Sequence, residues 1–349
     1  MSREKVNTLI SIVKEYSRVA VVSHDNPDPD SIASAFGLHL LLEKRTRTKV
    51  DVCFSGIVGR VGNRVMLKTS GIRYHWLDRI DLSQYDGVII VDSQPGAGNN
   101  SIPPSIIPVA VLDHHPPRPE LQRVRYVDVR ADLGATSTIV TEYLLQARVK
   151  IDPKLATSLL YGIKSETLDL SRRTTPADIQ AYLRLFHLVD FNLLAKIQNP
   201  KLPRMYYEQL RRAMERAYVY DGVVISDVGQ DARPEMVAEA ADLLLRLEDV
   251  TWSVCYGEYD GDLFVSVRTD VSTANAGELV REVVDGLGSA GGHDTLAAAT
   301  IHGAPQSVQE LDQMKSYLTK RFLLRLGAGE KPISKLLEWK KRKSETQAA

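Results

Sequence analysis

The stretch RVAVVSHDNPDPDSIASAFGLHLLLEK, residues 18–44, carries the pattern on which the fold prediction rests. A short apolar run, Val19–Val22, is followed by a polar loop and then by a helical pattern from Ser31 to Lys44. Apolar runs rich in β-branched residues are typical of strands that are buried on both faces of a parallel sheet. A strand followed closely by a helix predicts an α/β unit.

Two later segments repeat this design. The runs GVIIVD and PVAVLDHH end at Asp92 and at Asp113, His114 and His115. Helical patterns follow over residues 135–146, 153–167 and 176–188. We therefore predict an α/β domain with a doubly wound, mainly parallel sheet. Ligands of such sheets bind beyond the carboxyl ends of the strands, so all three polar endings are expected at one edge.

A second region begins after the proline-bounded stretch NPKLPR, residues 199–204. A hairpin signal at Asp260-Gly261, between strand and helix patterns, predicts a smaller α/β domain with a mixed sheet. Its expected elements are a strand over 222–228 and helices over 234–247, 276–285 and 307–326. The predicted organisation is a first domain over 1–195, a helical linker over 196–218, a second domain over 219–330 and a basic, then polar tail over 331–349.

The chain has 349 residues, of which 44 are basic and 44 acidic, so its formal net charge is zero. Such a balance gives no global attraction to nucleic acid or to a membrane surface, and any anion-binding surface is expected to be local. The two cysteines, Cys53 and Cys255, lie far apart in apolar segments, which indicates a reducing compartment. The sequence has no signal-peptide pattern and no apolar run of membrane-spanning length. We expect a soluble, cytoplasmic protein.

The loop after the first apolar run has the spacing His24-x3-Asp28-x-Asp30. Imidazole and carboxylate groups suit divalent metal ions, and Pro27 and Pro29 stiffen the loop so that the ligands are partly arranged in advance. The alternative is a polar turn in which Asp30 caps the following helix. Because capping alone does not account for His24 and Asp28, we favour metal binding.

The other polar positions are ambiguous when each is taken alone. Asp92 could cap a turn at a strand end, and His114-His115 could lie in a surface turn that ends at two prolines. Asp169 could belong to a solvated helix end. Arg268 follows a strand pattern, and the triplet Gly291-Gly292-His293 could be an ordinary loop or could offer backbone N–H groups to an anion.

Taken together, these motifs resemble those of the DHH phosphoesterases, and the resemblance covers about residues 10–325. The segments GATSTIVTEYL (134–144) and LLYGIKSETLDL (159–170) also fit that family's pattern. VSVRTD and the later AGGHD resemble the DHH-associated domain of the RecJ-like branch, most of all the nanoRNase and pAp-phosphatase type. The run TLAAATI after AGGHD departs from the Gly-containing run of many relatives, which leaves the substrate subgroup open.

The resemblance implies two divalent metal ions, most commonly Mn²⁺, with Mg²⁺ and Co²⁺ as alternatives. The implied metal ligands are His24, Asp28, Asp30, Asp92, His114 and Asp169. The implied catalytic residues are Asp92, as the bridge between the ions, and His115, which faces the scissile phosphate. Asp25 and Asp113 are expected to support the histidines beside them. The implied substrate-binding residues are His115, Arg268, Gly291, Gly292 and His293, and the active site is expected in a cleft between the domains.

The activity implied is hydrolysis of short linear oligonucleotides, from di- to tetranucleotides, or of pAp to mononucleotides. Two cations suit this reaction because they neutralise the phosphate charge and lower the pKa of a bound water. The alternative is a phosphodiesterase of signalling dinucleotides, such as cyclic-di-AMP or pApA, cyclic-di-GMP or pGpG, and cyclic GMP-AMP. A third hypothesis, from another class, is a non-catalytic nucleotide sensor. We expect no binding of long nucleic acid or of membranes, and the resemblance makes a homodimer one expected assembly.

Overall fold

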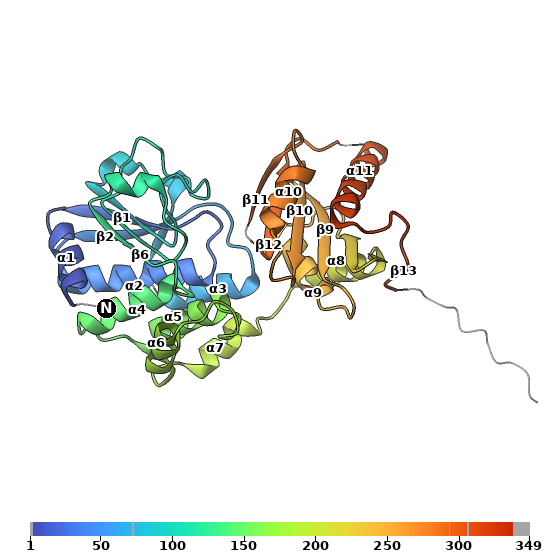
Figure 1. Ribbon diagram of the computed structural model, residues 1–349. Helices are drawn as coiled ribbons and strands as arrows, with labels where there is room; N and C mark the ends of the chain where they lie inside the picture. Colours follow the sequence, from blue (N-terminus) through green and yellow to red (C-terminus); the bar gives the residue numbers. More distant parts are fainter. Residues whose placement is uncertain (1–2, 72, 293, 306, 338–349) are drawn as a thin grey trace, which may run out of the picture. The chain divides into compact units, whose positions relative to one another are not determined.

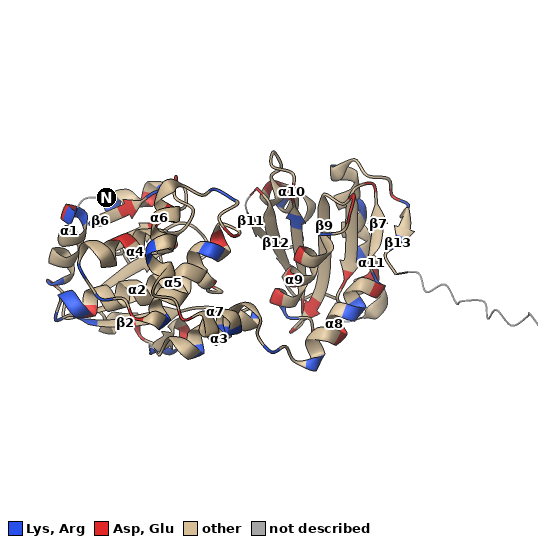
Figure 2. Ribbon diagram, turned by 90° about the horizontal axis from the view of Figure 1, so that it is seen from below, with Lys and Arg blue, Asp and Glu red and all other residues tan. Residues whose placement is uncertain are grey.

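The computed structural model describes residues 3–71, 73–292, 294–305 and 307–337. It divides into two compact units between Lys201 and Leu202, and each unit contains its own sheet and core (Figure 1). Basic and acidic residues are interspersed over the elements of both units (Figure 2), which agrees with the zero net charge. None of the described helices is long and apolar enough to cross a membrane.

The first unit is built on a six-stranded sheet with the order β3-β2-β1-β4-β5-β6, in which every neighbouring pair is parallel. The strands are β1 (Arg18–Val22), β2 (Lys49–Phe54), β3 (Tyr74–Trp76), β4 (Gly87–Val91), β5 (Ala110–Asp113) and β6 (Tyr126–Val129). This confirms the predicted parallel sheet. The strand order reverses between β1 and β4, which is the point where ligands bind in sheets of this type.

Among the described residues of the first unit, seven α-helices accompany this sheet. They are α1 (Arg3–Val13), α2 (Pro29–Arg45), α3 (Val61–Ser70), α4 (Thr136–Gln146), α5 (Pro153–Glu166), α6 (Pro176–Phe186) and α7 (Phe191–Gln198). All seven contribute to one core with alternate residues of the central strands, such as Val19 and Val21 of β1. The predicted helices therefore form within a few residues of their expected bounds.

The other face of the sheet is covered mainly by loops. Three short 3-10 helices lie along them: η1 (Leu77–Arg79), η2 (Leu82–Gln84) and η3 (Pro119–Arg123). Ala20 and Val22 of β1 pack there against Leu77 and Leu121. The segments that cross this face are rich in proline, which removes an N–H donor and interrupts α-helices.

The second unit contains a seven-stranded sheet with the order β11-β12-β10-β9-β8-β7-β13. Its strands are β7 (Tyr218–Tyr220), β8 (Val223–Asp227), β9 (Trp252–Tyr259), β10 (Asp262–Thr269), β11 (Ser289–Gly292), β12 (Leu296–Ile301) and β13 (Ser334–Lys335). The pair β8 and β9 is parallel and the other pairs are antiparallel, so the predicted mixed sheet is confirmed. Asp260 and Gly261 form the β9–β10 turn with φ of 52° and 81°, as a two-residue hairpin loop requires.

Four helices of the described part of this unit cover the two faces of the sheet. They are α8 (Arg204–Glu215), α9 (Pro234–Leu244), α10 (Ala276–Val283) and α11 (Val308–Leu326). α10 and α11 share one core, whereas α8 and α9 share the other. α8 lies in the stretch predicted as a linker, and its Ala213 is fully buried in the second core with Val224 and Val237. It is therefore an integral part of the second unit.

Candidate metal centre

The carboxyl ends of β1, β4 and β5 bring together His24, Asp92 and His114. His24 Nε2 lies 3.6 Å from Asp92 Oδ2 and 3.7 Å from Asp28 Oδ1. His114 Nε2 lies 3.7 Å from the other oxygen of the same carboxylate, Asp92 Oδ1. Two sets of ligand atoms, each within 4.8 Å of one another, result: His24 with Asp28 and Asp92, and Asp92 with His114 and His115. Asp92 belongs to both sets, so the arrangement suits two adjacent cations.

Both imidazoles present the same nitrogen to the carboxylates. His24 Nδ1 lies 2.8 Å from the carbonyl oxygen of Asp25, and His114 Nδ1 lies 3.3 Å from that of Leu133. A carbonyl oxygen only accepts, so each Nδ1 carries a proton, and Nε2 is the nitrogen that each ring can offer to a cation in place of its own second proton. Nε2 of His114 is buried without a hydrogen-bond partner. A bound cation would satisfy this atom, so the donor set fits divalent metal ions.

Asp92 holds a strained backbone conformation. Its φ is +58°, in the left-handed region that L-residues seldom occupy, and only 2% of the residue is exposed. This backbone conformation, at the end of β4, places the side chain between His24 and His114. Strain of this kind in a buried polar residue is common at functional sites.

Asp28 and Asp30 have different surroundings. Asp28 caps α2, because its Oδ1 accepts from the backbone N–H of Ser31 at 2.9 Å, while the same oxygen faces His24. Asp30 is 1% exposed, and its two oxygens accept from the backbone N–H groups of Thr136 and Ser137, each at 2.7 Å. The alternative reading of Asp30 as the cap of α2 is therefore wrong. Asp30 lies against the first turn of α4, and it is in neither set of converging ligand atoms.

The buried acids of the centre are crowded. Burial raises the pKa of Asp30 well above its usual value, and the charges of Asp92 and Asp28 raise it further. Burial acts to lower the pKa of His24, but hydrogen bonds and charge from Asp28 and Asp92 outweigh it and hold that pKa well above its usual value. Positive charge is thus favoured here, and bound cations would relieve the repulsion among the carboxylates.

Glu166, the last residue of α5, joins this group of acids. Burial raises its pKa, the charges of Asp28 and Asp92 raise it further, and His114 acts in the opposite direction. The structure does not bring the predicted ligand Asp169 into the cluster: its side chain is 70% exposed and pairs with Lys164. This is a correction to the sequence prediction, which passed over Glu166.

The reason lies in where α5 ends. Leu159 and Ile163 are fully buried, and Glu166 follows them at helical spacing on the same face. Asp169 lies three residues beyond the helix end, in a segment whose residues 168–170 all have positive φ. Helical periodicity within LLYGIKSE is the signal that could have selected Glu166. Nearby, Arg172 donates from Nη2 to the carbonyl oxygen of Glu166 at 2.9 Å.

His115 is held differently from the other two histidines. Its Nδ1 lies 2.8 Å from Asp113 Oδ1, which also accepts from the backbone N–H of His114 at 2.8 Å. Burial acts to lower the pKa of His115, but the hydrogen bond and charge of Asp113 raise it to about 9. The side chain of Gln94, which the sequence analysis did not select, donates from Nε2 to Asp113 Oδ2 at 2.7 Å. The side-chain oxygen of Gln94, Oε1, also accepts from the backbone N–H of Arg118 at 2.9 Å, so Gln94 holds the loop after β5 in place.

Asp25 supports His24 through its main chain, as described above, and not through its carboxylate. The two carboxylate oxygens accept from Ser101, at 3.0 Å from its backbone N–H and 2.9 Å from its hydroxyl. Asp25 therefore ties the first loop of the centre to the segment that follows Asp92.

Apart from His115, the predicted substrate-binding residues belong to the second unit. Arg268 Nε donates to Asp242 Oδ1 at 2.6 Å, and the arginine side chain is only 13% exposed. Gly291 and Gly292 form part of the edge strand β11 and do not precede a helix. His293 lies outside the described residues.

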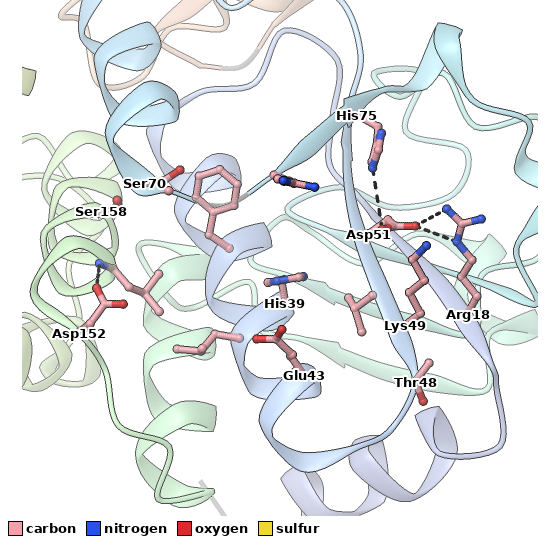
Figure 3. A pocket seen from close by; sticks show the side chains of 16 residues that line it. Arg18, His39, Glu43, Thr48, Lys49, Asp51, Ser70, His75, Asp152 and Ser158 are labelled. Carbon is pink, nitrogen blue, oxygen red and sulfur yellow. Dashed lines mark hydrogen bonds and ion pairs between the residues drawn. The ribbon is translucent and has the colours of Figure 1, made fainter.

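A groove of about 730 Å³ lies at the other end of the first sheet, beside the first residues of β1 and β2 (Figure 3). Several of its charges are already used: Arg18 pairs with Asp51 at 2.6 Å, and Asp152 caps α5 through the backbone N–H of Leu155. The converging imidazoles and carboxylates lie instead at the carboxyl ends of the strands. We therefore assign the chemistry to that edge and not to the groove.

Comparison with known proteins agrees with this geometry. Residues 18–163 match the DHH family, N-terminal domain, and residues 220–321 match the DHHA1 domain. The chain contains a DHH N-terminal domain and a DHHA1 domain. The family predicted from the sequence motifs is thus confirmed, and the matched ranges contain His24, Asp28, Asp92 and His114.

Three curated proteins are similar in sequence to this chain. It is 32% identical to an uncharacterised protein, MJ1633, of Methanocaldococcus jannaschii, over 80% of this chain and 57% of that protein. It is 25% identical to the cyclic-di-AMP phosphodiesterase GdpP of Bacillus subtilis, over 90% of this chain and 50% of that protein. It is 22% identical to the probable bifunctional oligoribonuclease and PAP phosphatase NrnA of Streptococcus mutans, over 89% of this chain and 98% of that protein. The chain thus spans about half the length of the first two proteins.

Two solved structures share the fold. An exopolyphosphatase-related protein from Bacteroides fragilis superposes with a TM-score of 0.69 and 14% identity, over 93% of this chain and 98% of that one. The exonuclease RecJ bound to manganese superposes with a TM-score of 0.51 and 15% identity, over 93% and 94%. At such low identity these similarities concern the fold alone.

Proposed function

We propose that this DHH protein is a metal-dependent phosphoesterase that hydrolyses short nucleotides. The observation that carries the proposal is the Asp92 carboxylate, whose two oxygens face two different imidazoles. A carboxylate in that position suits a bridge between two cations. The family match and the manganese-bound RecJ structure support divalent metal ions, with Mn²⁺ as the first candidate and Mg²⁺ and Co²⁺ as alternatives.

His24, Asp28 and Asp92 would hold one ion, and Asp92 with His114 would hold the other. Glu166 lies close enough to Asp28, Asp92 and His114 for their charges to shift its pKa, so we assign it as a further ligand in place of Asp169. Asp30, which the sequence also nominated, would act by holding α4 against the centre. When bound, the ions would neutralise phosphate charge and lower the pKa of a water molecule.

His115 would face the scissile phosphate. Asp113 holds Nδ1 of its ring, so Nε2 is the atom that we assign to an oxygen of the substrate. A histidine oriented by a carboxylate is suited to hold a proton at that atom and to donate it to a leaving oxygen. Gln94 and Asp113 would keep the ring in place through the loop after β5.

Short linear oligonucleotides and pAp are the first substrate candidates. The relative NrnA, named as an oligoribonuclease and PAP phosphatase, matches over 98% of its own length, which supports this choice. Signalling dinucleotides are the second candidate, because the relative GdpP is named as a cyclic-di-AMP phosphodiesterase and matches 90% of this chain. The zero net charge favours small substrates over long nucleic acid, and the two converging sets of ligand atoms favour an enzyme over a non-catalytic sensor.

The proposed function is tested by hydrolysis with purified protein and Mn²⁺ on a panel of substrates. The panel contains pAp, pApA, a 5-mer, a 24-mer, cyclic-di-AMP, cyclic-di-GMP and cyclic GMP-AMP. We expect turnover of pAp or pApA and much slower cleavage of the 24-mer. Preferred cleavage of a cyclic dinucleotide would select the second candidate. Metal binding without turnover of any substrate would favour the sensor, and cleavage of the 24-mer at an equal rate would refute the preference for short substrates.

Addition of Mn²⁺ to the chelator-treated protein is expected to raise its melting temperature. A ligand at 100 times its Kd stabilises a folded protein by about 2.7 kcal/mol, which is about 5 °C or more for a domain of this size. Calorimetry with and without Mn²⁺ measures the shift, and Ca²⁺ at the same concentration reports on nonspecific charge screening. An unchanged melting temperature together with no Mn²⁺ binding by titration calorimetry would rule out the metal centre.

Arg268→Met is expected to raise KM for a substrate with a terminal phosphate by about 10-fold, because a charge-assisted hydrogen bond contributes about 1.5–3 kcal/mol. The matched control is Asp242→Asn, which removes the partner of Arg268 but keeps the guanidinium. We expect this control to retain the KM of the wild type. If both variants lose stability equally and neither changes KM, Arg268 has only a structural role. Three further expectations stay predictions. They are substrate binding by Gly291, Gly292 and His293, a cleft between the domains, and a homodimer.

A further inference from the structure

Thr136 contacts two acids of the proposed centre at once. It is the first residue of α4 and is fully buried. Its hydroxyl donates to Asp92 Oδ1 at 2.7 Å, and its backbone N–H donates to Asp30 Oδ2 at 2.7 Å. One residue therefore links the end of β4 to the start of α2.

The hydroxyl bond determines how the Asp92 carboxylate is turned. The oxygen that accepts from Thr136, Oδ1, is the one that faces His114, and Oδ2 faces His24. The torsion between Cβ and Cγ of an aspartate is intrinsically soft, so the side chain alone does not select this plane. Rotation about that bond would move both oxygens away from their imidazoles. A fixed donor on Oδ1 prevents this rotation.

The local structure of α4 gives no other use for this hydroxyl. The residue before it, Ala135, occupies the N-cap position without a side-chain hydrogen bond, and alanine is a poor cap. The first N–H groups of the helix are satisfied from outside, by Asp30. By contrast, the hydroxyl of Thr141, one turn later, bonds to the carbonyl oxygen of Ser137 in its own helix. Thr136 directs its hydroxyl away from the helix and onto Asp92.

We infer that Thr136 is a positioning residue of the metal centre, whose hydroxyl keeps one oxygen of Asp92 in front of each imidazole. The inference rests on the proposed function, because it assigns Asp92 to both cations. Residues that orient metal ligands in this way commonly change metal affinity by about 10- to 100-fold when they are replaced. A loss of metal affinity on replacement would distinguish a positioning role of Thr136 from a role in packing alone.

The test uses Thr136→Val, which keeps the shape of the side chain and removes the hydroxyl, and Thr136→Ser, which keeps the hydroxyl. The matched control is Thr138→Val, because Thr138 is also buried in α4 and its hydroxyl donates to a buried carboxylate, Asp178, at 2.6 Å. We measure Mn²⁺ affinity by titration calorimetry and by the electron paramagnetic resonance signal of free Mn²⁺. T136V is expected to bind Mn²⁺ about 10- to 100-fold more weakly, T136S to recover most of the affinity, and T138V to resemble the wild type.

Each other outcome has a distinct meaning. Unchanged Mn²⁺ affinity in T136V, or equal losses in T136V and T138V, would overturn the positioning role. If the wild type binds Mn²⁺ and hydrolyses nucleotides under these conditions, that result leaves the proposed function intact. If the wild type binds no Mn²⁺, the proposed function itself fails. Should T136V not fold, Thr136→Ala, which removes the hydroxyl without adding a methyl group, is measured in its place.

Discussion

Asp92→Asn is expected to reduce nucleotide hydrolysis by at least about 10³-fold at saturating Mn²⁺, a loss typical of removing one member of an interdependent catalytic unit. The two candidate sets of metal ligands share this carboxylate, so one substitution weakens both cation positions. Asparagine keeps the size of the side chain and can still accept from Thr136, so the effect reports mainly on the lost charge. Single-turnover hydrolysis and Mn²⁺ titration measure it.

The same substitution is expected to change the stability of the metal-free protein little. The charge of Asp92 raises the pKa of Asp30, which shows that the acids repel one another. D92N also loses the attraction between Asp92 and His24, so without metal ions it should melt close to the temperature of the wild type, and it should lose the rise caused by Mn²⁺. Asp152→Asn is a suitable control, because Asp152 only caps α5 and asparagine caps helices equally well. A wild-type rate in D92N would show that Asp92 is not the bridge.

Glu166→Gln and Asp169→Asn are expected to differ sharply. E166Q should lower kcat/KM by at least about 10²-fold, the size of loss found when one charge-stabilising group of an active site is removed. The Glu166 side chain is partly buried, with 31% of it exposed, and the charges of Asp28, Asp92 and His114 act on it, so its charge would face the cations. Asp169 is exposed and forms a surface ion pair with Lys164, and such pairs contribute at most about 1 kcal/mol. D169N should therefore keep a rate close to that of the wild type.

Steady-state kinetics on one substrate, with Mn²⁺ varied, distinguishes the two acids. If Glu166 holds a cation, higher Mn²⁺ should restore part of the rate of E166Q. A large loss in D169N with a normal rate in E166Q would reverse the assignment, and would mean that the segment after α5 rearranges when the ions bind.

Much of the fold follows from local patterns. Apolar runs of β-branched residues predicted β1, β4 and β5, and helical patterns predicted α2, α4 and α5 to within two residues at each end. The parallel sheet then places the polar residues that end those strands at one edge, as the topology requires. His24, Asp92 and His114 could be nominated in this way because each lies at or just beyond the end of a strand.

The remaining assignments depend on contacts between segments far apart in the chain. Asp28 and Asp30 are two residues apart, yet one caps α2 beside His24 and the other faces the first turn of α4. Gln94 and Thr136 carry no motif, and their roles appear only where they meet Asp113 and Asp92. The Arg268 side chain is paired with Asp242, 26 residues earlier in the chain.

The contrast between Glu166 and Asp169 shows the physical reason. The motif predicted that an acid near the end of α5 belongs to the proposed site, because residue type and approximate position are local properties. Which acid points inward depends on the residue at which the helix stops and on the face that packs against α2 and the sheet. Those are set by the tertiary packing of Leu159 and Ile163, since burial of apolar side chains determines how a helix is rotated about its axis.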